Sequence, residues 1–188
     1  MNDIARLHNI LSQNRPLYDV IVKMAGFGLP NYYIGAGCIA QTVWNHLCGL
    51  ELMHGISDID IAYYDATDLS ANAENAVRQR IMHAIEPCTI EVDINNQARV
   101  HQWYKGSFGY DIAPYTSVED GISTWPTTAT AVGVRLKGNE LEVYAPFGLD
   151  DLFGMVVRAN KVQITEEIYM KKVQKWLRKW PQLAVVPW

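Results

Sequence analysis

Apolar residues recur along this chain with two periods, and the change between periods predicts its elements. Alternation predicts strands at about 31–35, 58–64 and 89–95, and a hairpin of strands 130–136 and 140–144 around Lys137-Gly138-Asn139. Helical spacing predicts long helices at about 2–13, 17–26, from the glycine turn to 48, 71–85, 148–158 and 165–180, and short ones at 97–104 and 117–125. Because strands and helices interleave, we expect an α/β or α+β fold with a sheet packed by helices.

Two aspartates lie two residues apart in the second strand. Residues at this spacing share a face, so Asp58 and Asp60 point the same way, and Ile59 and Ile61 point into a core. Neighbouring carboxylates raise each other's pKa unless a positive charge lies near them. The usual partner is a hard cation with oxygen ligands, Mg²⁺ above all. The alternative is a pair of solvated acids on an edge strand.

Two further segments add to this pattern. The first strand runs into the turn Gly35-Ala36-Gly37-Cys38, which a helix follows. Glycines at such a turn let backbone N–H groups approach an anion, and the helix N-terminus adds partial positive charge. The third strand carries Glu91 and Asp93 on one face. From the pattern alone, either acid could be a third carboxylate of the same site.

The order of these motifs resembles that of the DNA polymerase β-like nucleotidyltransferase superfamily. Within it, the chain is similar to a small stand-alone bacterial nucleotidyltransferase family, through residues 35–45, 56–65, 91–104, 125–135 and 141–153. The resemblance implies a polymerase β-like fold with a mixed sheet. The pattern departs from the superfamily at Gly-Ala-Gly-Cys, where Gly or Ser commonly follows a Gly directly. The gap to Asp58 is also longer, closer to that of enzymes that add nucleotides to tRNA ends.

The resemblance also implies roles for individual residues. It places the metal ligands and catalytic carboxylates at Asp58, Asp60 and Asp93, and so favours Asp93 over Glu91. It places the nucleotide-gripping turn at Gly35, Ala36, Gly37 and Cys38. The implied cofactor is Mg²⁺ or Mn²⁺. The implied reaction moves a nucleoside monophosphate from a nucleoside triphosphate to an acceptor hydroxyl, with release of pyrophosphate.

Arg99 follows the third strand and carries the only positive charge between Arg80 and Lys105. A site with three carboxylates and a triphosphate needs cationic groups, and arginine can meet phosphate oxygens with two parallel hydrogen bonds. We therefore expect Arg99 to face the cleft and bind the nucleotide. The alternative is an ion pair with a surface acid such as Glu119.

Length and composition limit the remaining choices. The 188 residues, with 49% hydrophobic residues and a net charge of −4, suit one domain over 1–188 with its core at about 30–160 and flanking helices at both ends. We expect no membrane partner, because no long apolar run is present. Three cysteines without a spacing pattern suggest a reducing cytoplasm and no structural zinc.

Charge leaves three function classes open. The acidic balance favours a small-molecule or protein acceptor over RNA, since it argues against a broad phosphate-binding surface. The first alternative is an enzyme that modifies RNA ends, which would use the basic stretch Lys161–Lys179. The second alternative is a non-catalytic nucleotide-binding module of the same fold. The three aspartates argue against that module.

Overall fold

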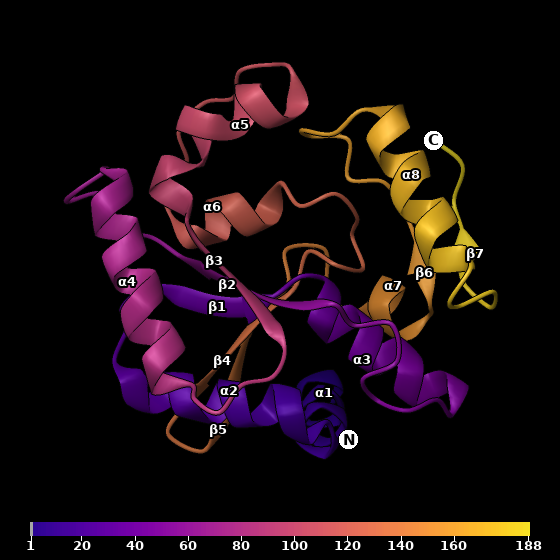
Figure 1. The fold of residues 1–188 in the computed structure, drawn as a ribbon. Helices are drawn as coiled ribbons and strands as arrows, with labels where there is room; N and C mark the ends of the chain where they lie inside the picture. Colours follow the sequence, from indigo (N-terminus) through magenta and orange to yellow (C-terminus); the bar gives the residue numbers. More distant parts are fainter. Residues whose placement is uncertain (1) are drawn as a thin grey trace.

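Within residues 2–188, which the computed structural model describes, five strands form one mixed sheet in the order β3-β2-β1-β4-β5 (Figure 1). β2 and β3 run parallel, and the other neighbouring pairs are antiparallel. The expectation of a mixed sheet packed by helices is therefore confirmed. The strands are β1 (Tyr32–Gly35), β2 (Asp58–Tyr63), β3 (Glu91–Asn96), β4 (Gly133–Lys137) and β5 (Glu140–Tyr144).

The helices begin where the sequence offers capping groups. The Ser70 hydroxyl accepts the N–H of Ala73 at the start of α4, and the Thr165 hydroxyl accepts the N–H of Ile168 at the start of α8. The helices are α1 (Asp3–Gln13), α2 (Arg15–Phe27), α3 (Gly37–Cys48), α4 (Ala71–Ala84), η1 (Gln97–Arg99), α5 (Val100–Phe108), α6 (Val118–Ser123), α7 (Asp150–Phe153) and α8 (Glu166–Leu177). None of the helices described is both long and apolar enough to cross a membrane.

The sheet has one fully covered face and one partly open face. Ile59 and Ile61 of β2 enter the main core, as predicted, together with buried side chains of α1, α2, α3 and α4. Ala62 belongs to the opposite face, where it packs with Tyr33 and with Val118 of α6. Since Asp58 and Asp60 alternate with the two isoleucines, they lie on this second face.

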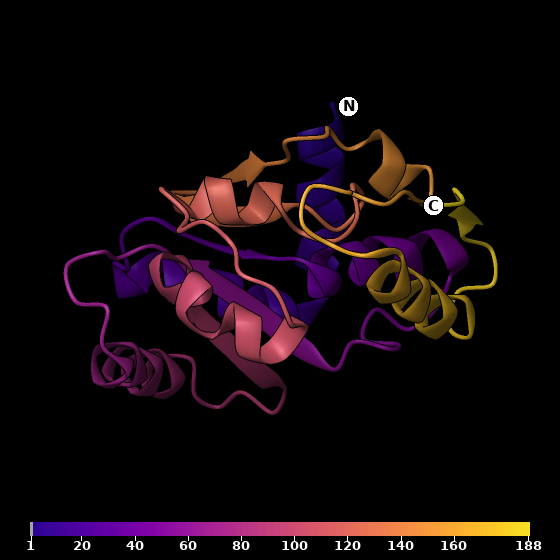
Figure 2. The same ribbon diagram turned by 90° about the horizontal axis from the view of Figure 1, so that it is seen from above.

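The C-terminal helix α8 is fixed to α3 at one end of the molecule, away from α4 (Figure 2). The Trp44 ring of α3 makes edge contacts with the rings of Trp176 and Trp180, each at 5.5 Å between centroids. The Trp180 indole N–H donates to the Asn45 side-chain oxygen at 2.7 Å. These contacts hold one face of α8 across from the ends of β1 and β2.

The largest departure from the predicted elements falls after β5. A helix was expected at 148–158, but α7 covers only Asp150–Phe153. Met155 takes a positive φ of 54°, and the chain enters β6 (Val156–Val157). β6 pairs in parallel with β7 (Ala184–Val185), which the sequence pattern did not predict. The hairpin is confirmed, with Lys137 opposite Glu140, although its first strand begins at Gly133 and not at 130.

Candidate active site

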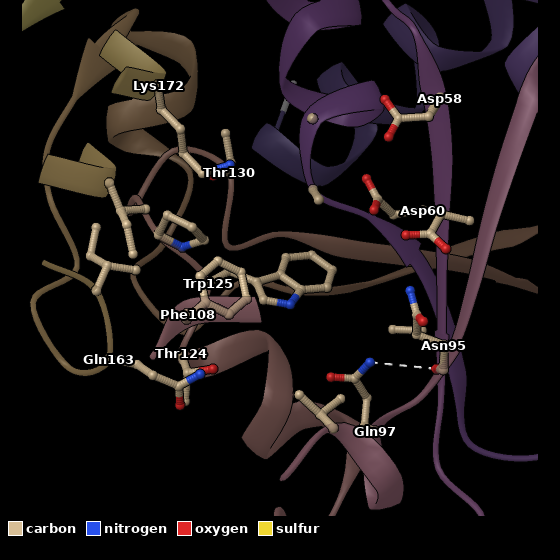
Figure 3. Close-up of a pocket in the computed structure, with 18 of the residues that line it drawn as sticks. Asp58, Asp60, Asn95, Gln97, Phe108, Thr124, Trp125, Thr130, Gln163 and Lys172 are labelled. Atoms are coloured by element: carbon tan, nitrogen blue, oxygen red, sulfur yellow. Dashed lines mark hydrogen bonds between the residues drawn. The ribbon is translucent and has the colours of Figure 1, made fainter. Parts of the chain in front are cut away.

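A cavity of about 380 Å³ lies over the open face of the sheet, and α8 closes one side of it (Figure 3). Its first wall comes from the β1–α3 turn and the strands β2 and β3. Its second wall comes from α5, the segment around Trp125, the segment before α8, and α8 itself. Charged side chains gather at one end of this cavity, and aromatic and amide side chains at the other.

The three predicted carboxylates all line this cavity. Asp60 of β2 lies directly opposite Asp93 of the parallel strand β3, and Asp58 lies opposite Glu91. Residues in register on neighbouring strands share a face, so the alternation of both strands carries these acids to one side. Asp93 lines the cavity, whereas Glu91 is exposed and lies outside it. The geometry thus separates the two candidates that the sequence pattern left open.

The electrostatics of Asp60 reflect this crowding. Removal from water, followed by the neighbouring charges of Asp58 and Asp93, raises the pKa of Asp60 to about 7. The Lys172 ammonium of α8 opposes that rise. Burial in turn lowers the pKa of Lys172, while the carboxylates of Asp60 and Asp58 act in the opposite sense. Negative charge is therefore in excess at this end of the cavity.

The donors present suit a hard cation in their chemistry. Three carboxylates of neighbouring strands face one space, and carboxylate oxygens are the ligands that hard cations prefer. Within residues 2–188, however, no three His, Cys, Asp or Glu side chains are gathered closely enough to form a ready-made metal site. The carboxylates share a cavity without forming the tight cluster that we expected.

Ala36 and Gly37 line the cavity at the turn between β1 and α3. Ala36 takes φ 61° and ψ −131°, a backbone conformation that is rare outside glycine, and its N–H donates to the Val132 carbonyl at 3.1 Å. The first N–H groups of a helix have no partner inside the helix. The amides at the start of α3, beginning with Gly37, are therefore the donors that this turn offers.

Gly35 and Cys38, the other two residues of the predicted turn, do not line the cavity. A Cβ atom on Gly35 would lie 2.5 Å from the Val132 carbonyl oxygen and 2.7 Å from the Trp125 ring. The Cys38 thiol is buried and donates to the Gly35 carbonyl at 3.0 Å, and burial raises its pKa. Close packing therefore explains why position 35 is a glycine, and Cys38 contributes a small buried side chain.

Arg99 does not agree with the prediction that it faces the cleft. It is buried, it is not part of the cavity wall, and its Nε donates to the Leu69 carbonyl at 2.8 Å. Its guanidinium forms an ion pair with Glu74 of α4, whose other oxygen accepts the N–H of Asn96. Arg99 thus ties α4 to the end of β3. The alternative, an ion pair with an acid, is borne out in kind, but the acid is the mostly buried Glu74 and not Glu119, which accepts from the Tyr33 hydroxyl.

The second wall contains residues that sequence reasoning did not assign to the site. Trp103, Tyr104 and Thr130 are among them, and all three line the cavity. The basic stretch contributes two lysines to it. The unassigned lining residues include Gln41, Thr124, Trp125 and Gln163. Gln163 sits in an irregular segment, where no local pattern distinguishes it.

Comparison with known proteins agrees with this arrangement. The model of a family described as nucleotidyltransferase matches residues 23–185. An NMR structure described as revealing a CCA-adding enzyme head domain is similar, with a TM-score of 0.77, 25% sequence identity and coverage of 96% of each chain. None of the curated proteins compared with the chain matches it. With a family match over most of its length and a head-domain fold over nearly all of it, this chain belongs to a family of nucleotidyltransferases.

Proposed function

We propose that this protein transfers a nucleoside monophosphate from a nucleoside triphosphate to an acceptor hydroxyl and releases pyrophosphate. The observation that carries the proposal is the placement of Asp58, Asp60 and Asp93 on one cavity. Gly37 at the start of α3 and Lys172 of α8 line that same cavity. Carboxylates for cations and basic donors for phosphates are thus present together.

Each group has a distinct role in the proposed reaction. Asp58, Asp60 and Asp93 would hold Mg²⁺ or Mn²⁺, which when bound would balance charge on the attacking and the leaving oxygens. An Asp93 carboxylate oxygen would also accept the proton of the acceptor hydroxyl. The Gly37 amide and the Lys172 ammonium would bind the β and γ phosphates. The protein then contributes mainly by positioning and charge.

The acceptor is proposed to be a small molecule or a protein, in keeping with the net charge of −4. Transfer to an RNA end is the second candidate. The likeness to a structure described as a CCA-adding enzyme head domain favours it, as do Lys172 and Lys175 in the cavity wall. A non-catalytic module of this fold would bind nucleotide without releasing pyrophosphate.

A screen for pyrophosphate release distinguishes these candidates. Each of the four nucleoside triphosphates is incubated with the protein, Mg²⁺ and fractions of cell extract, before and after nuclease or protease treatment of the fractions. Activity that survives nuclease supports the proposed acceptors, and activity that nuclease abolishes supports the RNA candidate. Nucleotide binding without pyrophosphate in any fraction would support the non-catalytic module and contradict the proposal.

A further inference from the structure

The end of the cavity away from the carboxylates has a different chemical character. In Figure 3, Gln163 and Thr124 lie far from Asp58 and Asp60, and Trp125 is drawn between the two groups. The lining side chains at this end are aromatic or uncharged: Tyr104, Phe108, Tyr115, Thr124, Trp125 and Gln163. Phosphates belong at the charged end, so the uncharged end is the part of the cavity that suits a nucleobase.

Trp125 offers a fixed flat surface in this region. Its ring packs so closely on the β1–α3 turn that a Cβ atom on Gly35 would lie 2.7 Å from it. The Asn160 side chain donates to the carbonyls of Trp125, at 2.9 Å, and Ser123, at 2.7 Å. Stacking on an aromatic ring tolerates every base. Trp125 could thus bind a base here, and discrimination among bases requires a further group.

The side chain of Gln163 is suited to discriminate among bases, because two tyrosines hold this residue in place. The Tyr110 hydroxyl donates to its backbone carbonyl. The Tyr115 hydroxyl lies 2.8 Å from its side-chain nitrogen and 3.0 Å from its side-chain oxygen. Tyr115 also lies 2.8 Å from the Thr124 hydroxyl, which donates to the Gly121 carbonyl at 2.8 Å.

One arrangement of hydrogens satisfies every hydroxyl of this chain and orients the Gln163 amide. The single hydroxyl hydrogen of Thr124 goes to Gly121, so Thr124 must accept from Tyr115. When the Tyr115 hydroxyl donates to Thr124, it accepts an N–H from Gln163 at 2.8 Å; the Gln163 side-chain oxygen lies 3.0 Å from the same hydroxyl, which can also donate to it. In this arrangement the amide nitrogen makes the shorter of the two contacts with Tyr115. Within residues 2–188, its second N–H and its carbonyl oxygen have no other hydrogen-bond partner.

We propose that Gln163 reads the hydrogen-bonding edge of the nucleobase, with Tyr115 as the positioning residue for its amide and Trp125 as the stacking surface. This inference rests on the proposed nucleotide substrate and extends it to base selection. Adenine and cytosine present an exocyclic amino donor beside a ring-nitrogen acceptor, while guanine and uracil present an exocyclic oxygen beside a ring N–H. An amide that can flip can hydrogen-bond to both pairs of bases, whereas an amide held in one orientation is complementary to only one pair.

The test is the dissociation constant of each of the four nucleotides, measured by calorimetry with Mg²⁺. The probes are α,β-methylene triphosphates, whose α–β bond cannot be broken by the proposed transfer. We expect the wild-type protein to separate adenine and cytosine from guanine and uracil by roughly tenfold, in one direction or the other. Tyr115→Phe should move the ratio of dissociation constants between these two pairs of nucleotides toward one, because it removes the hydroxyl that holds the Gln163 amide. Gln163→Leu should abolish the ratio, and the exposed Gln174→Ala on α8 should leave it unchanged.

The outcomes separate this inference from the function on which it rests. Loss of affinity for all four nucleotides by the same factor in Tyr115→Phe would indicate a structural role only, and would overturn the inference. So would an unchanged ratio, or a preference that divides purines from pyrimidines. If Tyr115→Phe does not fold, as judged by its melting curve, Gln163→Leu decides alone. Failure of every nucleotide to bind the wild-type protein would overturn the proposed function as well.

Discussion

The ring of Trp125 occupies the space that a side chain on Gly35 would need. A methyl group there would also meet the Val132 carbonyl, a backbone atom that cannot move alone. At Gly37, the same methyl group would meet only the Gln41 side-chain nitrogen at 2.8 Å. The two glycines of this motif are therefore present for different reasons. Gly35 leaves room for close packing, and Gly37 keeps the turn open to the cavity.

This difference predicts opposite results for two alanine substitutions. Gly35→Ala should lower the free energy of unfolding by about 1–3 kcal/mol, the usual effect of overpacking. Gly37→Ala should fold with nearly wild-type stability, because Gln41 can turn aside. Urea denaturation of both variants measures the effect. Equal stability of the two would mean that the Trp125 ring does not pack on the turn as described.

Arg99 gives a second prediction for a single residue. Arg99→Lys keeps the charge but loses the fork that reaches both the Leu69 carbonyl and Glu74. We expect a loss of roughly 1–3 kcal/mol in the free energy of unfolding, and no change in nucleotide affinity. Arg158→Lys, in the more exposed pair with Asp151, serves as the matched control and should change stability little. A weaker affinity with unchanged stability would restore Arg99 to the binding site.

Among the elements, α8 contributes most to the second wall. Its acidic first turn and basic last turn suit the helix dipole, as the sequence indicates. Its tryptophan contacts with α3 add a second effect, because they hold Lys172 over the carboxylates. Lys171, one position earlier, instead pairs with Glu167 on the exposed side at 2.8 Å. The same helix thus presents one lysine to the cavity and another to solvent.

Two substitutions on this helix test that division. Lys172→Met keeps the length of the side chain and removes its charge. Charge-assisted hydrogen bonds contribute about 1.5–3 kcal/mol, so triphosphate affinity should fall by roughly tenfold or more. Lys171→Met should leave affinity unchanged. The dissociation constant of a methylene triphosphate, measured for both, provides the comparison, and equal effects would exclude a specific role for Lys172.

Prediction from sequence succeeded for elements whose signals are local. The alternation in β2 and β3 placed Asp58, Asp60 and Asp93 on one face because the period of a strand is fixed by its backbone. The helix expected at 148–158 failed because Val156 and Val157 pair with a strand that comes nearly thirty residues later. No local pattern carries that pairing. Arg99 failed for a related reason, since its partner Glu74 lies on a helix that packs against β3 only in the folded chain.

For the molecule as a whole, the cavity combines one wall that the sequence predicts with one that it does not. The first wall comes from three motifs with recognisable order. The second is assembled from segments between residues 100 and 176 that meet only through packing. Gln163 consequently escaped assignment, and Lys172 was assigned only as part of the basic stretch, although the residue types of both suit a nucleotide site.

The crowded carboxylates also affect the stability of the whole fold. The pKa of Asp60 rises from its ordinary value of 3.8 to about 7 on folding. Between these values the folded protein holds a proton that the unfolded chain has released, so stability falls as pH rises from about 4 to about 7 and levels off above. In the presence of a chelator, the melting temperature should therefore drop more between pH 5 and 7.5 for wild type than for Asp60→Asn. Parallel curves would contradict the assigned pKa.

The most direct measurement follows two labels on one nucleoside triphosphate, in an extract fraction that supports turnover. With Mg²⁺, the label on the α-phosphate should enter the acceptor, and the label on the γ-phosphate should leave as pyrophosphate. Glu91→Gln should retain this transfer. The rate of transfer by Asp93→Asn should fall by roughly a hundredfold or more, the usual effect of removing one group that stabilises transition-state charge. Release of the γ label as free phosphate, or equal activity of the two variants, would contradict nucleotidyl transfer at these carboxylates.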